Sequence, residues 1–190
     1  MEDQKTDLRV IRTKKAIREA FCDMVIEMNY QDITIKELTR RAMINRNTFY
    51  LHYNTLDELV DELRDEIADK IISMYVSYDN IEDVKVMIRK FFEYVASPQS
   101  TLLERIMCCG SYRFLAKKIN EKVIIHRKET QRDATGMSEA AEEIVFSYYG
   151  SVAAVLFRKW VADGKKLSVE ELIELATKLI CHGVEGILNP

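Results

Sequence analysis

Glycine and proline, the residues that most often interrupt helices, are scarce in this chain. Its 190 residues include six glycines and two prolines; the first glycine is Gly110, and Pro98 is the only proline before the last position. Polar residues must therefore make nearly every break between elements, as in an all-α protein. With 47% hydrophobic residues, the chain can bury a core and could hold one or two domains.

Long apolar runs and paired cysteines are also missing. No stretch approaches the roughly 20 apolar residues that cross a bilayer, and the first residues lack an apolar secretory core, so we expect a cytoplasmic protein with no membrane partner. The four cysteines form no Cys-x-x-Cys pair, and no histidine has zinc-finger spacing. We therefore expect no metal site and reduced, mostly buried thiols. Cys108 and Cys109 could form a redox sensor, but packing is the commoner role in an apolar helix.

The patterns that mark enzymes are absent as well. The sequence has no glycine-rich phosphate loop, no nucleophile elbow and no metal-ligand spacing. Glu139, Glu142 and Glu143 fall at an expected helix start, where acids complement the helix dipole. The sequence thus predicts neither catalysis nor a cofactor.

The most informative segment, residues 34–53, has the pattern of two short helices joined by a tight turn. Thr34 can cap the first helix and Asn45 the second. Their inward faces would be apolar, formed by Ile35, Leu38, Ala42, Phe49 and Tyr53. The second helix then begins with Arg46, Asn47 and Thr48, in the turn that enters the major groove in helix-turn-helix proteins.

Residues 44–53 and 56–59 together resemble the signature of TetR/AcrR-type transcriptional regulators, in particular a firmicute-type subgroup. The run is long, matches residue types at fixed spacing and lies in the first third of the chain. The resemblance implies a three-helix DNA-binding domain over residues 1–55. It also implies a helical domain over residues 56–190 that binds a small-molecule effector and forms a homodimer.

The resemblance also assigns roles within the DNA-binding segment. Arg46, Asn47 and Tyr50 would reach base edges of a double-stranded operator, with Lys36 adding a contact. The sugar-phosphate contacts would come from Thr34, Thr48, Tyr50, Leu51 and His52. Two positions depart from common members: Met43 replaces a frequent glycine in a turn that favours a left-handed backbone, and Leu56 replaces a phosphate-contacting lysine found in some.

Charge is unevenly distributed along the chain. The net charge is −3, but residues 8–54 carry nine basic and five acidic side chains, which gives this part +4 and leaves −7 for the rest. A basic head on an acidic body would orient the protein toward DNA through one end, because phosphate attraction acts on that end only.

Apolar periodicity predicts long helices on both sides of the helix-turn-helix. The first covers residues 8–28, and another begins after a Thr55-x-x-Glu58 capping box and links head to body. In the body we expect helices over 81–96, 101–109, 112–132, 139–163 and 169–188.

The last two predicted helices are apolar on more than one face, and a helix apolar all round must be covered all round. We expect a second copy to cover the extra faces, and the resemblance implies a four-helix dimer bundle there. A thick monomer core is the alternative. The candidate interface residues are Gly150, Ala154, Phe157, Leu179, Gly183 and Ile187.

The central helices of the body are rich in aromatic and methionine residues. Such side chains can line an adaptable apolar pocket, although each is more often plain core. The candidate pocket residues are Met74, Tyr78, Phe91, Met107, Tyr112 and Tyr148.

Seven basic residues between Tyr112 and Arg132 face only two acids, Glu121 and Glu129. Such a run is usually a solvated helix face, but it could be a partner surface.

From the helix-turn-helix pattern and the resemblance we expect a ligand-responsive regulator, most often a repressor on a palindromic operator. One alternative is a coactivator of the same fold that acts through a protein partner, with weak or no DNA binding. A second, less favoured alternative is an enzyme-like helical domain that sequesters a ligand.

Overall fold

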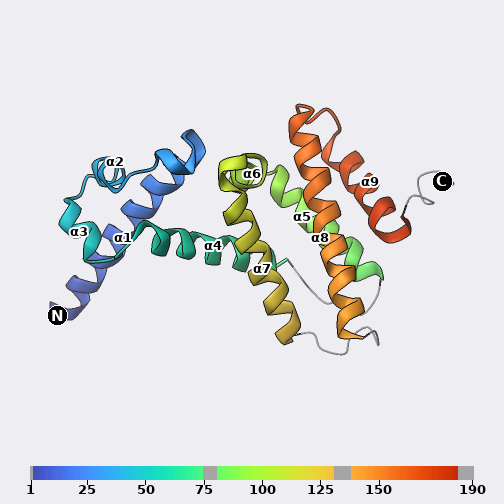
Figure 1. Ribbon diagram of the computed structural model, residues 1–190, viewed down its shortest axis with the longest axis horizontal. Helices are drawn as coiled ribbons and strands as arrows, with labels where there is room; N and C mark the ends of the chain where they lie inside the picture. Colours follow the sequence, from blue (N-terminus) through green and yellow to red (C-terminus); the bar gives the residue numbers. More distant parts are fainter. Residues whose placement is uncertain (1, 75–80, 131–137, 184–190) are drawn as a thin grey trace.

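The computed structural model describes residues 2–74, 81–130 and 138–183. Within these ranges the chain is all-α, as the scarcity of glycine and proline predicts, and contains no strand. Figure 1 shows an elongated molecule with a head at the N-terminal end, a bundle at the C-terminal end, and one helix running between them.

The head consists of α1 (Glu2–Glu27), α2 (Ile35–Arg41) and α3 (Arg46–Tyr50), with the 3-10 turn η1 (Tyr30–Asp32) between the first two helices. The predicted first helix was too short, since α1 already begins at Glu2. Residues 2–7 contain no helix-breaking residue, and acids near a helix N-terminus complement its dipole. The head core is closed by fully buried Ile17, Met24, Leu38 and Phe49.

The connecting helix α4 (Leu56–Ile72) is capped by Thr55, which accepts a hydrogen bond from the Glu58 amide. The predicted capping box is only half formed. The Glu58 carboxylate turns instead to Asn54, accepting from its backbone amide and from its side-chain amide, both at 2.8 Å. This pair still satisfies an amide at the helix start, so the residue type was informative although its partner was wrong.

The body contains α5 (Ile81–Ala96), α6 (Thr101–Cys108), α7 (Arg113–Thr130), α8 (Glu139–Ala162) and α9 (Val169–His182), with the 3-10 turns η2 (Pro98–Ser100) and η3 (Gly110–Tyr112) on either side of α6. Ser138 caps α8, and Ser168 with Glu171 forms a complete capping box on α9. The helix predicted to continue to residue 188 ends at His182, because Gly183 takes a positive φ of 63° and stops the helical ladder.

Head and body share one continuous cluster of buried residues. Tyr112, which is fully buried, lies at the junction and donates a hydrogen bond to the Met28 carbonyl at 2.8 Å. Arg105 of α6 donates to the carbonyls of Val25 and Met28 at 3.2 and 3.3 Å. The body thereby satisfies carbonyls at the end of α1 that have no partner within the helix.

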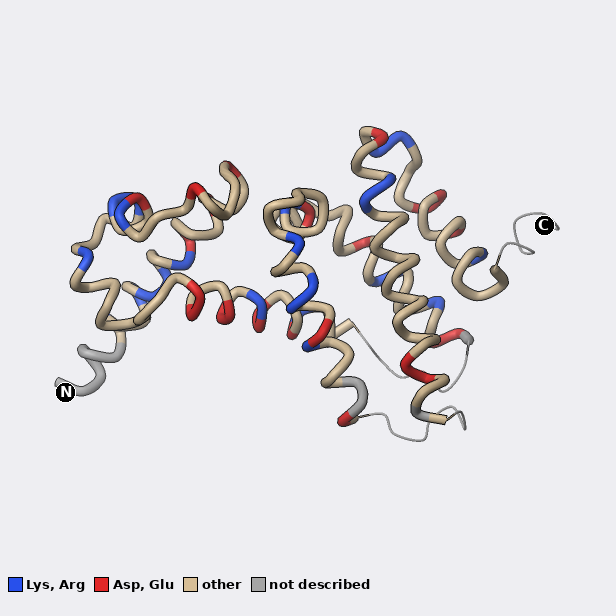
Figure 2. Tube along the Cα trace, in the orientation of Figure 1, with Lys and Arg blue, Asp and Glu red and all other residues tan. Residues whose placement is uncertain are grey.

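A second connection joins α4 to α7, which pack against each other. Acidic residues follow one another along α4, as Figure 2 shows. Lys118 Nζ lies 3.0 Å from Asp61, and Lys122 Nζ lies 3.1 Å from Asp65 and 2.8 Å from Asp69. Part of the basic run after Tyr112 is therefore neither a solvated face nor a partner surface, because these two lysines pair with aspartates of α4.

Helix α8 corrects the expectation that no segment could cross a membrane. The stretch Ala140–Ala162 reaches a mean hydropathy of 1.2 and is long enough for a span, yet only 6% of that apolar window is buried. Length and composition of a single helix are weak evidence for a span. The exposed apolar surface nevertheless needs a cover of some kind.

Candidate nucleic-acid interface and ligand cavity

The two head helices that follow the first form a helix-turn-helix whose caps are those expected from the sequence. Thr34 accepts from the Glu37 amide at 3.2 Å, and Asn45 accepts from the Asn47 amide at 2.9 Å. Thr39, although buried, needs no outside partner because its hydroxyl donates to the Ile35 carbonyl at 2.9 Å. Local hydrogen bonds therefore fix both helix starts, and of the residues predicted to contact DNA only Thr34 uses its side chain for this.

The turn between these helices contains the strained position anticipated at Met43. This residue has φ 53°, in the left-handed region that favours glycine, and its side chain is 92% exposed. The amide of Ile44 donates to the Thr39 carbonyl at 3.0 Å and closes the turn. The helix-turn-helix geometry is therefore kept, at the steric cost of a left-handed non-glycine residue.

The inward and outward faces of α3 are sharply different. Phe49 is fully buried and Tyr53 nearly so, with ring centroids 5.6 Å apart. On the other face Arg46, Asn47 and Tyr50 are exposed. Arg46 lies over the Tyr50 ring, 5.6 Å from its centroid, and donates to the Tyr50 hydroxyl at 3.1 Å. This contact holds the guanidinium at the tip of the helix, where its remaining donors are available.

The other predicted DNA contacts lie around the same edge. Thr34, Lys36 and Leu51 are exposed, while Thr48 and His52 are half-buried. The residues that the sequence pattern selected thus belong to α2, α3 and the positions directly beside them, and none of them is buried. Tyr53, behind them, donates to Glu62 of α4, and burial raises its pKa, helped by that hydrogen bond.

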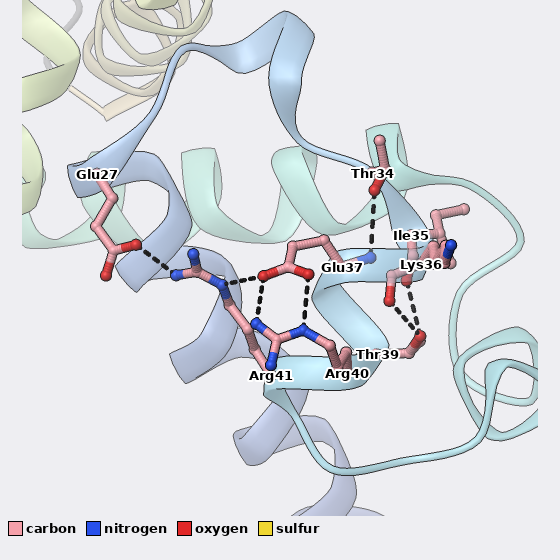
Figure 3. Close-up of polar contacts among 8 residues, drawn as sticks. All are labelled: Glu27, Thr34, Ile35, Lys36, Glu37, Thr39, Arg40 and Arg41. Atoms are coloured by element: carbon pink, nitrogen blue, oxygen red, sulfur yellow. Dashed lines mark hydrogen bonds and ion pairs between the residues drawn. The ribbon is translucent and has the colours of Figure 1, made fainter.

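The arginines of α2 have a different place, shown in Figure 3. Glu37 accepts from Arg40 Nη2 at 2.6 Å and from Arg41 Nε at 2.9 Å, and Arg41 also donates to Glu27 at 2.6 Å. The hydrogen bonds from Arg40 and then Arg41 lower the pKa of Glu37 to about 2. Both arginines of α2 are therefore paired internally, whereas Lys36 and Arg46 form no ion pair with any described residue.

A cavity of about 580 Å³ lies in the body, between α4, α5, α6, α7, α8 and α9. Its volume falls within the roughly 300–1,000 Å³ typical of small-molecule sites. Three of the predicted pocket residues line it, namely Met74, Phe91 and Met107. The apolar lining is completed by residues such as Ile88, Phe92 and Phe146.

The remaining pocket predictions fall elsewhere. Tyr112 does not line the cavity. It lies at the head-body junction, where its hydroxyl donates to the Met28 carbonyl and its ring centroid is 6.2 Å from that of Tyr30. Tyr148 does not line the cavity either: it is 46% exposed, and its hydroxyl donates to the Leu179 carbonyl. Tyr78 lies outside the described residues. An aromatic pattern alone could not separate a pocket wall from a junction or an outer face.

The residues predicted for the dimer interface differ in their surroundings within one chain. Gly150 and Ala154 line the cavity, and a Cβ on Gly150 would lie 3.6 Å from Asn120 Oδ1 of α7, while Phe157 is fully buried within the chain. An exposed apolar stripe on α8 is formed by Ile144, Tyr148 and Val155, which are 70%, 46% and 54% exposed, and Val155 also borders the cavity. On α9, Leu179 and Gly183 are half-buried, and Ile187 lies outside the described residues.

Sequence analysis missed the polar part of the cavity. Arg113, Lys117 and Asn120 of α7, together with Arg158 of α8, are among its lining residues. The first three follow an i, i+4, i+7 spacing, which places them on one helix face. That spacing was visible in the basic run after Tyr112, but only the packed structure shows that this face borders a cavity.

Comparison with known proteins agrees with this geometry. No family model matches the chain. The solved structure of NalD, the secondary repressor of the MexAB-OprM multidrug efflux pump in Pseudomonas aeruginosa, matches with a TM-score of 0.68 and 15% identity over 96% of this chain and 98% of that one. A TetR transcriptional regulator from Streptococcus agalactiae matches with a TM-score of 0.62 and 22% identity over 94% and 98%. The chain has the TetR-family fold.

Two further matches add detail to this TetR-type architecture. The fatty acid degradation regulator FadR from Bacillus halodurans aligns with a TM-score of 0.60 and 20% identity, over 90% of this chain and 96% of that one. In sequence, 60 residues are 42% identical to YxbF of Bacillus subtilis (strain 168), described as an uncharacterized HTH-type transcriptional regulator. That match spans 31% of this chain and only 16% of YxbF, so it relates a segment and not the whole protein.

Proposed function

We propose that this protein is a ligand-responsive, DNA-binding transcriptional regulator, with repression of a palindromic operator as its action. The observation that carries the proposal is the exposed face of α3. There Arg46 and Asn47 stand free of any acidic partner among the described residues, on a helix whose opposite face is locked by Phe49. Arginine and asparagine are the side chains that read guanine and adenine edges in the major groove.

The proposed roles of single residues are those that the family resemblance implies. Arg46, Asn47, Tyr50 and Lys36 contact bases, while Thr34, Thr48, Leu51 and His52 contact the sugar-phosphate backbone. We assign DNA binding to residues 1–55, and effector binding and dimerisation to residues 56–190. Catalysis has no part in the proposal, since neither the cavity nor the head groups a nucleophile with a base in the described ranges.

A palindromic operator requires two copies, and the body offers a surface for the second. The Ile144, Tyr148 and Val155 stripe on α8 is exposed in one chain, although its composition is that of a buried helix. We propose that this stripe packs on the same helix of a second copy. The dimer would set the two α3 helices at the spacing of successive major grooves, roughly 34–36 Å.

The coactivator alternative has less support. A solved structure of the dihydroxyacetone kinase operon activator DhaS aligns with a TM-score of 0.52 and 18% identity, which reports the fold alone. The partner surface which this alternative required was the basic run of α7. Lys118 and Lys122 of that run already pair with α4, and Arg113 and Lys117 border the cavity.

The proposal is tested by measuring binding to DNA from upstream of the gene and to random DNA, over a range of salt concentrations. A dimeric reader should show a log-log salt slope of order −5 or steeper. Arg46→Ala and Lys36→Ala should each cost about 1–3 kcal/mol on the cognate site and little on random DNA.

His52→Ala provides the contrast, because a backbone contact should weaken both DNAs alike. Equal losses for Arg46→Ala on cognate and random DNA would make Arg46 a phosphate contact. Binding indifferent to salt would refute DNA recognition altogether. Binding that appears only when cell extract is added would favour the coactivator.

A further inference from the structure

The body cavity has a polarity that its apolar lining alone does not explain. Its wall includes three cations, Arg113, Lys117 and Arg158, and no aspartate or glutamate is among the described residues that line it. We propose that it binds an amphipathic anion, with a carboxylate or phosphate head at Arg113 and Arg158 and a hydrocarbon tail among the apolar side chains. The inference rests on the proposed function for its regulatory meaning, and names the chemical class of the effector.

Helix register brings the two arginines to one end of the cavity. A Cβ placed on Gly150 of α8 would lie 3.6 Å from Asn120 Oδ1 of α7, so these two residues stand at the same level, and the two helices run in opposite directions (Figure 1). Arg113 lies seven residues before Asn120, and Arg158 eight residues after Gly150. At about 1.5 Å of rise per residue, both are displaced along the helices by roughly 11–12 Å in the same direction. They therefore stand at about the same level.

Neither arginine is committed to an acid of the chain. Within residues 2–74, 81–130 and 138–183, no ion pair involves Arg113 or Arg158. The neighbouring cations behave differently: Lys118 and Lys122 pair with α4, and Lys159 pairs with Asp163 at 2.9 Å. Lys117 is intermediate, since it borders the cavity but also lies 3.6 Å from Glu121. Of the three cations that border the cavity, Arg113 and Arg158 are thus the two without an acidic partner among the described residues.

Backbone charge acts in the same direction. Arg113 is the first residue of α7, and the first turn of this helix contains no acid. The helix dipole places partial positive charge at that end, which favours an anion there and disfavours a cation. A bound headgroup would satisfy the dipole and both guanidinium groups together.

The rest of the cavity suits a tail better than a second polar group. Ile88, Phe92, Leu103 and Ile119 are buried to within a few per cent, and all line it. Met74, Met87 and Met107 add flexible thioether side chains, which adapt to tails of different shape. Asn120 is the lone uncharged amide in this wall among the described residues.

Titration calorimetry of the full-length protein with a set of equal-length amphiphiles tests the proposal. The probes are myristate, myristyl phosphate, myristyl alcohol and myristyltrimethylammonium, each below its micelle-forming concentration. Both anions should bind at least about tenfold more tightly than the alcohol, because charge-assisted hydrogen bonds from arginine are lost with a neutral head. The cation should bind most weakly. The ratio between the two anions distinguishes a carboxylate source from a phosphate source.

The variant Arg113→Gln/Arg158→Gln should lower anion affinity to that for the alcohol and leave alcohol binding unchanged. Lys159→Gln is the matched control, because it removes a neighbouring exposed cation that does not line the cavity, and it should keep the anion preference. Equal affinity of wild type for all heads, or an anion preference that survives the double variant, would overturn the proposal. The comparison of the four headgroups uses wild-type protein, so it does not depend on the folding of any variant. If wild-type protein binds the anions but no operator DNA, the proposed regulator function is refuted and the anion site is not.

Discussion

Tyr112→Phe is the sharpest test of how the body holds the head. The substitution keeps the fully buried ring and removes only the hydroxyl that donates to the Met28 carbonyl at 2.8 Å. A neutral hydrogen bond of this kind contributes about 0.5–1.5 kcal/mol. We expect the free energy of unfolding to fall by about 1 kcal/mol, which lowers Tm by about 2–4 °C for a chain of this size.

Arg105→Met removes the second donor to the same carbonyl and should cost about 1.5–3 kcal/mol, since its donor is charged. The two losses should not simply add. Either single variant leaves the Met28 carbonyl with one of these two donors, whereas the double variant removes both, and an unsatisfied partly buried carbonyl costs about 1–3 kcal/mol more. The double variant should therefore be less stable than the sum of the singles predicts.

Chemical denaturation of the four proteins measures this cycle directly. Tyr94→Phe is the matched control, because the Tyr94 hydroxyl has no hydrogen-bond partner among the described residues, and its removal should change stability little. Strict additivity in the cycle would mean that water reaches the Met28 carbonyl. The junction would then be a surface contact, and the argument that the body completes α1 would fail.

Three further predictions concern other parts of the chain. Met43→Gly should raise the free energy of unfolding by up to about 1 kcal/mol in thermal or chemical melts, because a left-handed backbone costs methionine more than glycine and the exposed side chain packs against little; a loss of stability would contradict this. Ile144→Glu, on the most exposed residue of the α8 stripe, should convert a sedimenting dimer to monomer, while Val86→Glu, on an exposed apolar residue of α5, should not; a wild-type monomer at micromolar concentration, or one that binds lipid vesicles, would refute the interface. Lys122→Met removes the cation shared by Asp65 and Asp69. It should change operator affinity little in the absence of amphiphile, but should reduce the change in operator affinity that a bound amphiphile causes. If the amphiphile changes operator affinity as much in the variant as in wild type, this contact does not link the cavity to the head.

Local chemistry made much of the head predictable. A cap residue, a buried aromatic and a short polar turn are set by neighbours in sequence, so Thr34, Asn45 and Phe49 take the expected positions. The same holds for the left-handed Met43. The Glu58 side chain shows the limit: two nearby donors competed for one carboxylate, and sequence spacing could not choose between them.

The body was predictable as helices but not as faces. Helix α8 is apolar around much of its circumference, so periodicity could not say which stripe turns inward. Packing against α5, α6 and α9 decided it, with Gly150 turned toward Asn120 across the cavity and Ile144 left outside. The polar cavity wall was missed for the same reason, because charge on a helix face acquires meaning only from the element opposite.

Helix α7 has two faces with different uses, and this bears on how an effector could act at a distance. One face borders the cavity with Arg113 and Lys117, and another grips α4 through Lys118 and Lys122. Helix α4 in turn meets the head, where Glu62 accepts from Tyr53 and Glu66 pairs with Arg18 of α1. An anion that draws the start of α7 toward the cavity must therefore shift the lysines that hold α4, or weaken their pairs. Either response changes how α4 supports the helix-turn-helix. Regulation then requires only that the effector binds the cavity with different affinity in two states of the protein that differ in the position of α4.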